Sequence, residues 1–550
     1  MKHHQKVLRP KGTLIVTVKG IRYVYVVAEK RYNKEKHYNE NKRVCIGKMI
    51  DREHMQTNDN YQDFFKEETE LQEAAASSDC IRIGTHMVIR KVLKELQLGD
   101  LVDGVFEDKA ALIKDCAAYM IVNETNTMQY FPEYGYDHAL FGENCTDSTV
   151  SRMFSELGDQ DIETFLKAWN AMHAGKSRIY VSYDSTNMNT VAGRVEMAEY
   201  GYAKEDSEKP QVNVSLAYDQ DNSIPLFYES YPGSIIDNTQ CRQMAERAER
   251  YGYQNISFIL DRGYFSKRNI QFLDEHQYGF LIMTKGNASF VSEAVEEVRM
   301  KLRLGVEQYI PEQEVNGITL KKKLFEDDRN RYFHIYYDDV RASLERRDLM
   351  KEFTRMDREL DKRQNAKLTE KQELHAYEKY YNLKFDQNGY FIKYQRKEKP
   401  IQRLMDDAGY FVIISSEEMS AEDALEKYRN RDSIEKLFRA EKSYLGGDSF
   451  RVYSDRAVDS KLLVSFIATI IRTEIFNRLK PLYQDDRKSY TVPAALHTLD
   501  RIMITRLPGE KYHLRYALTK SQAKILKEFH ITQENCAAYG EGLGSEVSGN

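Results

Sequence analysis

Residues 178–186 read RIYVSYDST, and residues 256–261 read ISFILD. Both are short apolar runs that reach an aspartate. Their length and near-continuous hydrophobicity are typical of strands buried on both faces of a sheet. The runs VNVSLAYD, IPLFYES and YGFLIMTK have the same character, and helical periodicity appears at about 237–251 and 266–275. This alternation of strands and helices predicts an α/β domain that begins near residue 178.

The α/β pattern breaks at about residue 288 and resumes at 409. The stretch between is charge-rich, and within it we predict strands near 331–338 and 389–395 and a long amphipathic helix over about 340–363. After it come the strand AGYFVIISS, a helix over about 421–445 and the apolar helix KLLVSFIATIIRTEIF. We therefore predict a core in two parts, 178–287 and 409–480, interrupted by a mixed α+β insertion domain at 288–408.

Both ends of the chain differ from this core in composition. Residues 1–48 contain 13 Lys and Arg against 3 Asp and Glu, although the whole chain carries a net charge of −5. The runs TLIVTV, IRYVYVVAEK and KRVCIGKM alternate as strands do, so residues 1–50 are predicted to form a small basic β-meander suited to phosphate contact. Residues 51–177 are predicted as a polar linker, up to about residue 80, and then a helical domain. Residues 481–550 are predicted as a C-terminal helical region whose last dozen residues, rich in Gly and Ser, are disordered.

The composition also excludes several classes of protein. A length of 550 residues suggests two to four domains, and a hydrophobic content of 41% is enough to form packed interiors. No apolar run approaches the length of a membrane span, and the start MKHHQKVLRPKG lacks the apolar core of a signal peptide. We therefore expect a cytoplasmic protein. The six cysteines form no CxxC pair, which argues against a zinc site or a disulfide framework.

Two aspartates stand where strands of the predicted core end. Asp184 closes RIYVSYD and Asp261 closes ISFILD, and ligand sites of open α/β sheets lie at the carboxyl ends of strands. The structural alternatives are a turn residue for Asp184 and a helix cap for Asp261, although Ser266 is better placed to cap the next helix. Two rivals of Asp184, at positions 219 and 221, are better explained by a hairpin turn between VNVSLAY and SIPLFY.

A third acid lies in YRNRDSIEKLFRAEK, residues 428–442. At roughly 100° per residue, Tyr428, Arg431, Glu435 and Lys442 fall on one stripe about 60° wide, and Arg439 extends the cationic row. The apolar side chains of Ile434, Leu437, Phe438 and Leu445 occupy the neighbouring arc. A solvated helix face usually mixes charges over the whole exposed arc, whereas here one acid is framed by cations and a tyrosine. The rival Glu441 points away from this stripe.

These residue types suit one kind of chemistry. Three ionised carboxylates that are brought together repel each other unless a divalent cation lies between them, and Mg²⁺ and Mn²⁺ prefer such oxygen ligands. Two such ions can activate a water or a 3′-hydroxyl and stabilise the leaving oxygen of an in-line displacement at phosphorus. Cations beside the acids are suited to holding the phosphate backbone on either side of the scissile bond.

The combination resembles the DDE transposases of bacterial insertion sequences, and in particular the cut-and-paste branch with a Y-x2-R-x3-E-x6-K signature. Here that signature is Tyr428, Arg431, Glu435 and Lys442, and the stretches YDST and DRGYFS resemble the family's first two acid motifs. The resemblance implies an RNase H-like core in which an inserted domain separates the second acid from the third. It implies that Asp184, Asp261 and Glu435 hold two Mg²⁺ ions, for which Mn²⁺ substitutes.

The resemblance further implies endonucleolytic cleavage of double-stranded DNA at element ends and strand transfer into target DNA by a homodimer on paired ends. Tyr428, Arg431, Arg439 and Lys442 are the residues expected to contact DNA. Two features depart from the best-studied relatives. The predicted insertion contains no Trp to stack on a flipped base, since the one Trp of the chain is Trp169, and residues 340–363 are predicted to be helical where relatives have mostly strands.

Other readings remain open at this stage. A stand-alone nuclease on the same fold does not explain the long basic front end, and a non-catalytic DNA-binding derivative is expected to have lost an acid. A carbohydrate hydrolase with paired carboxylates leaves the cations around Glu435 unexplained. Further candidates are Lys30, Arg31, Lys42 and Arg43 for phosphate contact, with solvated loop residues as the alternative. Asp237 is a candidate for supporting the site, with a helix cap as its alternative.

Overall fold

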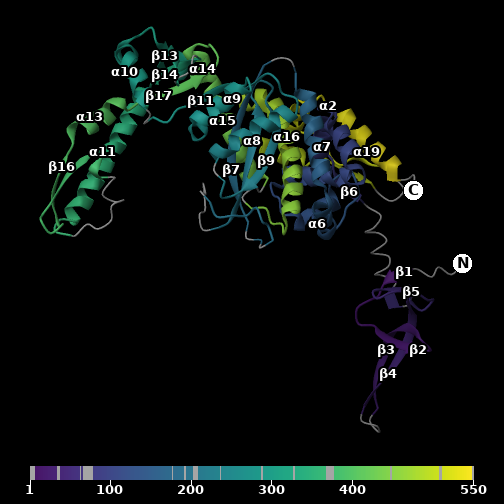
Figure 1. Cartoon of the computed structure of the whole chain (residues 1–550). Coiled ribbons are helices and arrows are strands. Elements are labelled where there is room, and N and C mark those ends of the chain that lie inside the picture. Colours follow the sequence, from purple (N-terminus) through teal and green to yellow (C-terminus); the bar gives the residue numbers. More distant parts are fainter. Residues whose placement is uncertain are drawn as a thin grey trace. The chain divides into compact units, whose positions relative to one another are not determined.

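The computed structural model describes residues 6–33, 38–61, 64–65, 79–175, 178–190, 192, 194–201, 209–235, 237–286, 289–325, 329–366, 377–445, 449–506 and 511–547 (Figure 1). The chain divides into two compact units. The first contains residues 1–83, 502–519 and 532–550, and the second contains residues 84–501 and 520–531. Within the described ranges, no helix is both long and apolar enough to cross a membrane.

The first unit contains the predicted β-meander. Its sheet has the order β1-β5-β4-β3-β2 and is antiparallel at each pairing, with β1 (Lys6–Leu8), β2 (Leu14–Val18), β3 (Ile21–Asn33), β4 (Tyr38–Met49) and β5 (His54–Thr57). Val24, Ile46 and Met55 are fully buried at its centre. The three predicted strands are confirmed. The expected linker from residue 51 is wrong for β5, because Met55 and Thr57 alternate inward and complete the sheet.

A second, small sheet of this unit joins distant parts of the chain. It has the order β19-β18-β6, with β6 (Asp79–Arg82), β18 (Met503–Arg506) and β19 (His513–Leu514), and the unit also contains α19 (Gln533–Val547). We predicted only helices after residue 481, and β18 escaped notice because its partner β6 lies more than 400 residues earlier. The prediction that the last dozen residues are disordered is wrong up to Val547, where α19 ends.

The second unit opens with the predicted helices. They are α2 (Gly84–Glu95), α3 (Leu98–Phe106), α4 (Ala110–Asn123), α5 (Phe131–Asp137), α6 (Asp147–Glu156) and α7 (Asp159–His173). The residue that caps α6 is Thr146, whose hydroxyl accepts the N–H of Thr149, so Asp147 and Ser148 lie one and two positions inside the helix. In α7, Trp169 is fully buried and donates to the carbonyl of Pro225 on β9 at 3.0 Å.

A large sheet forms the centre of the second unit. Among the described strands its order is β12-β13-β14-β17-β11-β10-β7-β8-β9. Strands β7 (Ile179–Asn189), β8 (Gln211–Asp219) and β9 (Ile224–Pro232) form an antiparallel meander, and β10 (Ile256–Leu260) and β11 (Gly279–Met283) continue parallel to β7. Strands β8, β10 and β17 (Tyr410–Ser415) are buried at every position, as the near-continuous apolar runs of β10 and β17 predict. Helices α8 (Asp237–Arg250) and α9 (Lys267–Glu275) pack against each other beside them (Figure 1).

The stretch predicted as an insertion contributes to this sheet before it departs from it. After α10 (Ser289–Leu304), strands β12 (Tyr309–Ile310), β13 (Val315–Lys323) and β14 (Asn330–Tyr337) extend the sheet beyond β17. Then α11 (Asp339–Lys362), the hairpin β15 (Tyr381–Phe385) and β16 (Phe391–Arg396), and α13 (Glu398–Asp407) enclose a core of their own around Phe353, Tyr381 and Phe391. The predicted strands near 331–338 and 389–395 and the helix over 340–363 are confirmed. The domain division at 288–408 stays a prediction.

The segment after β17 differs in one respect from the predicted single helix over 421–445. It forms two helices, α14 (Ala421–Arg429) and α15 (Asp432–Tyr444), separated by a turn at Asn430 and Arg431. At this turn the N–H groups of Arg431 and Ile434 reach carbonyls three residues back instead of four, so the backbone tightens. Helix α15 packs on β7, α4 and α16 (Asp455–Asp485), and its Ile434 and Phe438 are buried.

Three later helices complete the described part of the second unit. Long α16 contacts α4, α6 and β9 and contains the predicted apolar helix, and it is followed by α17 (Val492–Leu499) and α18 (Lys520–Lys527).

Candidate active site

Asp184 and Asp261 follow the last paired residues of two adjacent parallel strands. Strand β7 pairs with β10 from Ile179 to Tyr183, and Tyr183 is opposite Leu260, the last residue of β10. We expected Asp184 to end its strand, but β7 continues to Asn189 because β8 goes on pairing with it. Asp184 therefore lies within β7, at the point where the pairing with β10 stops. Both acids thus occupy the carboxyl edge of the parallel part of the sheet.

The carboxylate of Asp261 is held by its own chain and by α14. Its Oδ1 accepts the N–H of Arg262 at 2.7 Å and so caps the short 3₁₀ turn Arg262–Tyr264. The hydroxyl of Tyr428 donates to the same oxygen at 3.2 Å. The cap of α9 is Ser266, as predicted, with its hydroxyl accepting the N–H of Asn269.

Arg431 joins the first acid to the third. Its Nη1 lies 3.1 Å from Oδ2 of Asp184, and its Nη2 lies 2.6 Å from Oε1 of Glu435. The guanidinium also lies over the ring of Tyr428, 5.6 Å from the ring centroid. Tyr428 and Arg431 therefore connect all three predicted acids, which come from β7, the end of β10 and α15.

The connection perturbs the titration of both linking residues. Burial raises the pKa of the Tyr428 hydroxyl above its ordinary value, and the charge of Asp261 raises it further. For Arg431, burial acts to lower the pKa, but Tyr428 and the charges of Asp184, Asp261 and Glu435 outweigh burial and leave it raised. At neutral pH the tyrosine is therefore neutral and the guanidinium is charged.

The other predicted DNA-contacting residues lie further along α15. Arg439 is exposed and Lys442 is half-buried in the last turn of the helix. Because residues four and seven positions apart share a face of a helix, both lie on the same side of α15 as Glu435. We predicted that Tyr428 contacts DNA, but its ring is buried among Ile259, Tyr336 and other core residues.

The structure also places some of the alternative acids and of the further candidates for phosphate contact. Asp219 ends β8 and accepts the N–H groups of Asp221 and Asn222, which confirms the predicted hairpin turn. In the first unit, Lys42 and Arg43 are exposed on β4. The side chains of Lys30, Arg31, Asp237 and Glu441 lie outside the described residues.

The donor set is suited to a hard divalent cation. Asp184, Asp261 and Glu435 offer carboxylate oxygens, the ligands that Mg²⁺ and Mn²⁺ prefer. Their arrangement, however, is set by Arg431, which stands between Asp184 and Glu435. Within the described part of the chain, no three acidic, histidine or cysteine side chains are grouped closely enough to hold a metal ion.

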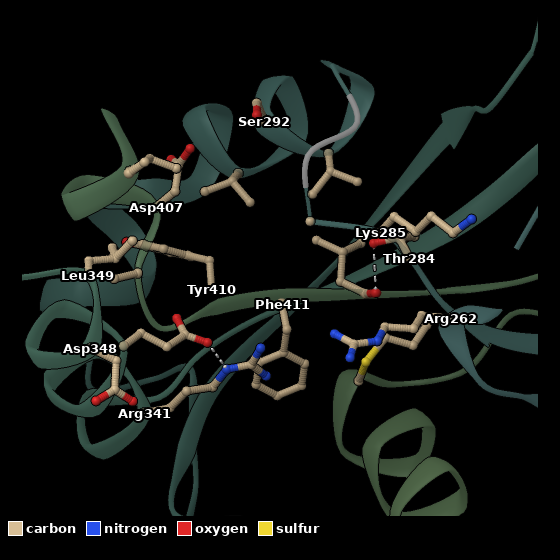
Figure 2. A pocket seen from close by; sticks show the side chains of 18 of the residues that line it. Arg262, Thr284, Lys285, Ser292, Arg341, Asp348, Leu349, Asp407, Tyr410 and Phe411 are labelled. Atoms are coloured by element: carbon tan, nitrogen blue, oxygen red, sulfur yellow. Dashed lines mark hydrogen bonds and ion pairs between the residues drawn. The ribbon is translucent and has the colours of Figure 1, made fainter. Parts of the chain in front are cut away.

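A cavity of about 950 Å³ borders the site on the side of α10 and α11. Arg262 and Gly263, which directly follow Asp261, form part of its wall, together with Lys285, two residues after the end of β11. Figure 2 shows Arg262 and Lys285 on one side of the cavity and Asp348 and Asp407 on the other. Phe411 on the floor is covered by Arg341, whose guanidinium carbon lies 4.9 Å from the ring centroid.

Sequence reasoning missed two features of this site. The first is the cationic wall of Arg262 and Lys285. Arg262 could have been found, since it adjoins a predicted catalytic acid, but Lys285 comes close only through the order of the strands. The second is that Arg431 pairs with two of the acids. A helical wheel gives the face of a residue, not its partner on another strand, and here the helix is broken at that residue.

The fold and the site together define a class of protein in which acidic side chains gather at the edge of a mixed sheet and basic side chains lie beside them. Residues 175–471, more than half of the chain, match the family model described as "Transposase DDE domain", and the chain belongs to this family. The match begins just before β7 and ends within α16, so it includes Asp184, Asp261 and Glu435.

The chain was also compared with curated proteins and with solved structures. No curated protein matches the chain. Among solved structures, a cryo-EM structure of the piggyBac transposase synaptic complex with hairpin DNA is similar with 8% identity and a TM-score of 0.31, over 73% of this chain and 63% of that one. The chain thus spans less than two thirds of that protein, and no argument rests on a similarity of this degree.

Proposed function

We propose that this protein is a transposase that cleaves DNA at the ends of a mobile element and transfers the freed strand into target DNA by a DDE mechanism. The observation that carries the proposal is the linkage of Asp184, Asp261 and Glu435 through Tyr428 and Arg431. The three acids are separated by long stretches of sequence, and the fold brings them to one edge of the sheet. Membership of the transposase DDE domain family supports the same conclusion.

We assign the core to the RNase H-like class. Three antiparallel strands, β9, β8 and β7, are followed by the parallel strands β10 and β11, and the third acid reaches the edge of β7 from a helix later in the chain. The elements between β11 and β17 would then be the insertion that separates the second acid from the third.

Asp184, Asp261 and Glu435 are the residues that would hold divalent cations, two Mg²⁺ with Mn²⁺ as a substitute. Such ions activate the attacking oxygen and stabilise the leaving oxygen at phosphorus. The chain's own contribution is to position the acids. Tyr428 orients Asp261 with a neutral hydroxyl, and the backbone N–H of Arg262 donates to the same carboxylate oxygen.

DNA is the partner that these charges suit. Arg439 and Lys442 continue the cationic side of α15 beyond Glu435, and Arg262 and Lys285 line the cavity that borders the site. Phosphates on either side of the scissile bond can be held by these residues. The basic sheet of residues 6–57 is a candidate for binding element ends. A homodimer on paired ends and a location in the bacterial cytoplasm, on the nucleoid, complete the proposal.

The experiment is cleavage of a supercoiled plasmid that carries the element ends flanking the gene, with Mg²⁺ or Mn²⁺. Asp184→Asn and Asp261→Asn are expected to lower cleavage by about 100-fold or more. Asp221→Asn, which changes an exposed turn between β8 and β9, serves as the matched control and keeps wild-type cleavage. Undiminished cleavage by either of the first two variants would contradict the assignment. Specific binding of the ends without cleavage would favour the non-catalytic derivative, and cleavage without end specificity or strand transfer would favour the stand-alone nuclease.

A further inference from the structure

We propose that Arg431 is an internal counter-cation that blocks metal binding by Asp184 and Glu435 until a DNA phosphate draws its guanidinium away. DNA binding and metal binding then strengthen each other through this residue. The inference rests on the proposed function, because it takes the two acids as metal ligands.

The contacts show a cation already in place between the acids. The two Nη atoms of Arg431 lie 3.1 Å and 2.6 Å from oxygens of Asp184 and Glu435. The Arg431 and Asp184 side chains are only 12% and 15% exposed, while that of Glu435 is 43% exposed. Asp184 is therefore largely shielded from solvent, and the guanidinium compensates its charge.

A divalent cation cannot share this position. Mg²⁺ requires carboxylate oxygens at about 2.0–2.1 Å in near-octahedral geometry. Here Oδ2 of Asp184 and Oε1 of Glu435 are each bonded to a guanidinium nitrogen, and Oδ1 of Asp184 accepts the N–H of Ser185. Because Arg431 spans Asp184 and Glu435, it has to leave at least one of them before both can bind the same ion. Glu435 is the more exposed partner and lies in the first turn of α15, so this ion pair is the one that opens with less loss of burial.

The position of Arg431 is well suited to such an exchange. It stands in the turn between α14 and α15, outside the regular hydrogen bonding of either helix. Its Nε is buried without a hydrogen-bond partner in the described part of the structure, so the ion pairs leave one strong donor unused. Like a carboxylate, a phosphate presents two oxygens that the planar guanidinium can bind in a bidentate manner. Release of Arg431 toward a phosphate therefore replaces its ion pairs and frees the acids for a metal.

Linkage makes the effect reciprocal. If DNA removes the cation that competes with the metal, DNA tightens metal binding, and the metal tightens DNA binding by the same factor. The protein would then bind its metal ions, and become able to cleave, mainly when it is bound to DNA.

The experiment measures Mn²⁺ binding to the full-length protein by isothermal titration calorimetry, with and without a short duplex carrying an element end. Without DNA, Arg431→Gln is expected to bind Mn²⁺ on the order of 10-fold more tightly than the wild type. Arg439→Gln is the matched control, since it removes the same charge one turn beyond Glu435 from an exposed position. With the duplex, Mn²⁺ affinity is expected to rise clearly for the wild type and distinctly less for Arg431→Gln.

Two outcomes would overturn the proposal. The first is a Mn²⁺ affinity of Arg431→Gln, measured without DNA, that equals the affinity of the wild type or that of Arg439→Gln. Removal of the competing ion pairs would then have no specific effect on metal binding. The other is an equal effect of the duplex on both proteins. Asp261→Asn separates this failure from failure of the proposed function. If Asp261→Asn binds Mn²⁺ as well as the wild type does, the metal site itself is wrongly assigned. If Asp261→Asn loses Mn²⁺ binding, the assignment of the metal site holds, and the Arg431→Gln results then test the role of Arg431 alone.

Discussion

Single residues of this protein show how burial decides the role of a charged group. Arg431 is largely shielded, with 12% of its side chain exposed, and is paired with two acids, whereas Arg439, eight positions later, is exposed on the same segment. The same contrast separates Asp221, exposed in a turn, from Asp115, which is buried in α4 and accepts the N–H groups of Phe141 and Gly142. A buried carboxyl such as that of Asp115 couples stability to pH.

Asp115 gives a prediction about pH. Burial raises the pKa of its carboxyl to about 6, against the opposing effect of the two backbone N–H groups. The folded protein therefore holds this proton more tightly than the unfolded chain does. The resulting stabilisation is fully present below about pH 4 and is lost as pH rises through 6, a change of at most about 3 kcal/mol.

Urea unfolding of the wild type and Asp115→Asn, at several pH values between 4 and 7.5, measures this contribution. The difference between the two free energies of unfolding should change across this range, with the wild type losing stability relative to the variant as pH rises. A difference that is constant with pH would contradict the assignment.

At the scale of elements, the β10–turn–α9 segment and the end of β11 place cations beside the acids. Arg262 and Lys285 line the same side of the cavity next to Asp261, and both are exposed (Figure 2). Neither is needed to hold a strand or a helix together, so their role is expected to be electrostatic.

The double variant Arg262→Gln/Lys285→Gln should weaken binding of duplex DNA of any sequence and reduce the slope of log K against log salt concentration by about 2. Fluorescence anisotropy over a range of salt concentrations measures both quantities. The control is Lys351→Gln/Arg355→Gln, which removes two exposed cations of α11 that lie outside the cavity wall. An unchanged salt slope in the first variant, or the same loss in the control, would exclude a specific phosphate contact at this wall.

The elements themselves were largely predictable, and the reason is periodicity. Apolar runs such as ISFIL and YFVIIS identify buried strands by composition alone, and β10 and β17 lie where these runs stand. Strands β5, β6 and β18 were missed because they are short, and β6 and β18 pair with each other across more than 400 residues. The break between α14 and α15 was missed because Asn430 and Arg431 are compatible with a helix, and the turn is set by tertiary packing.

The sequence predicts which residues form the candidate site but not their contacts. The spacing of Tyr428, Arg431 and Glu435 predicts the third acid, and the strands before the two aspartates predict the other two. Which carboxylate each linking residue would touch depends on the register of β7 against β10 and on the turn before α15, and neither can be read from one sequence.

At the scale of the whole molecule, the chain separates a basic sheet from the unit that carries the acids. The sheet of residues 6–57 belongs to the first unit with its own core around Val24 and Met55, and the acids belong to the second unit. Recognition of ends and cleavage would then be properties of different parts of one chain.

Deletion of residues 1–65 tests this separation. The shortened protein keeps β6, β18 and β19 and all of the second unit, so it is expected to fold and to nick DNA in a metal-dependent manner. It should lose its preference for element ends over other DNA. Circular dichroism and competition binding with the two kinds of duplex measure these properties. A retained preference would place end recognition in the second unit.

The most direct measurement is metal-dependent cleavage at element ends by the wild type, Glu435→Gln and Glu441→Gln, with DNA binding measured in parallel. If the three linked acids form the catalytic centre, Glu435→Gln will bind the ends normally and cut at least about 100-fold more slowly, and Glu441→Gln will cut as the wild type does. Equal cutting by Glu435→Gln and the wild type would contradict the account, and loss of cutting in Glu441→Gln alone would move the third acid to that position.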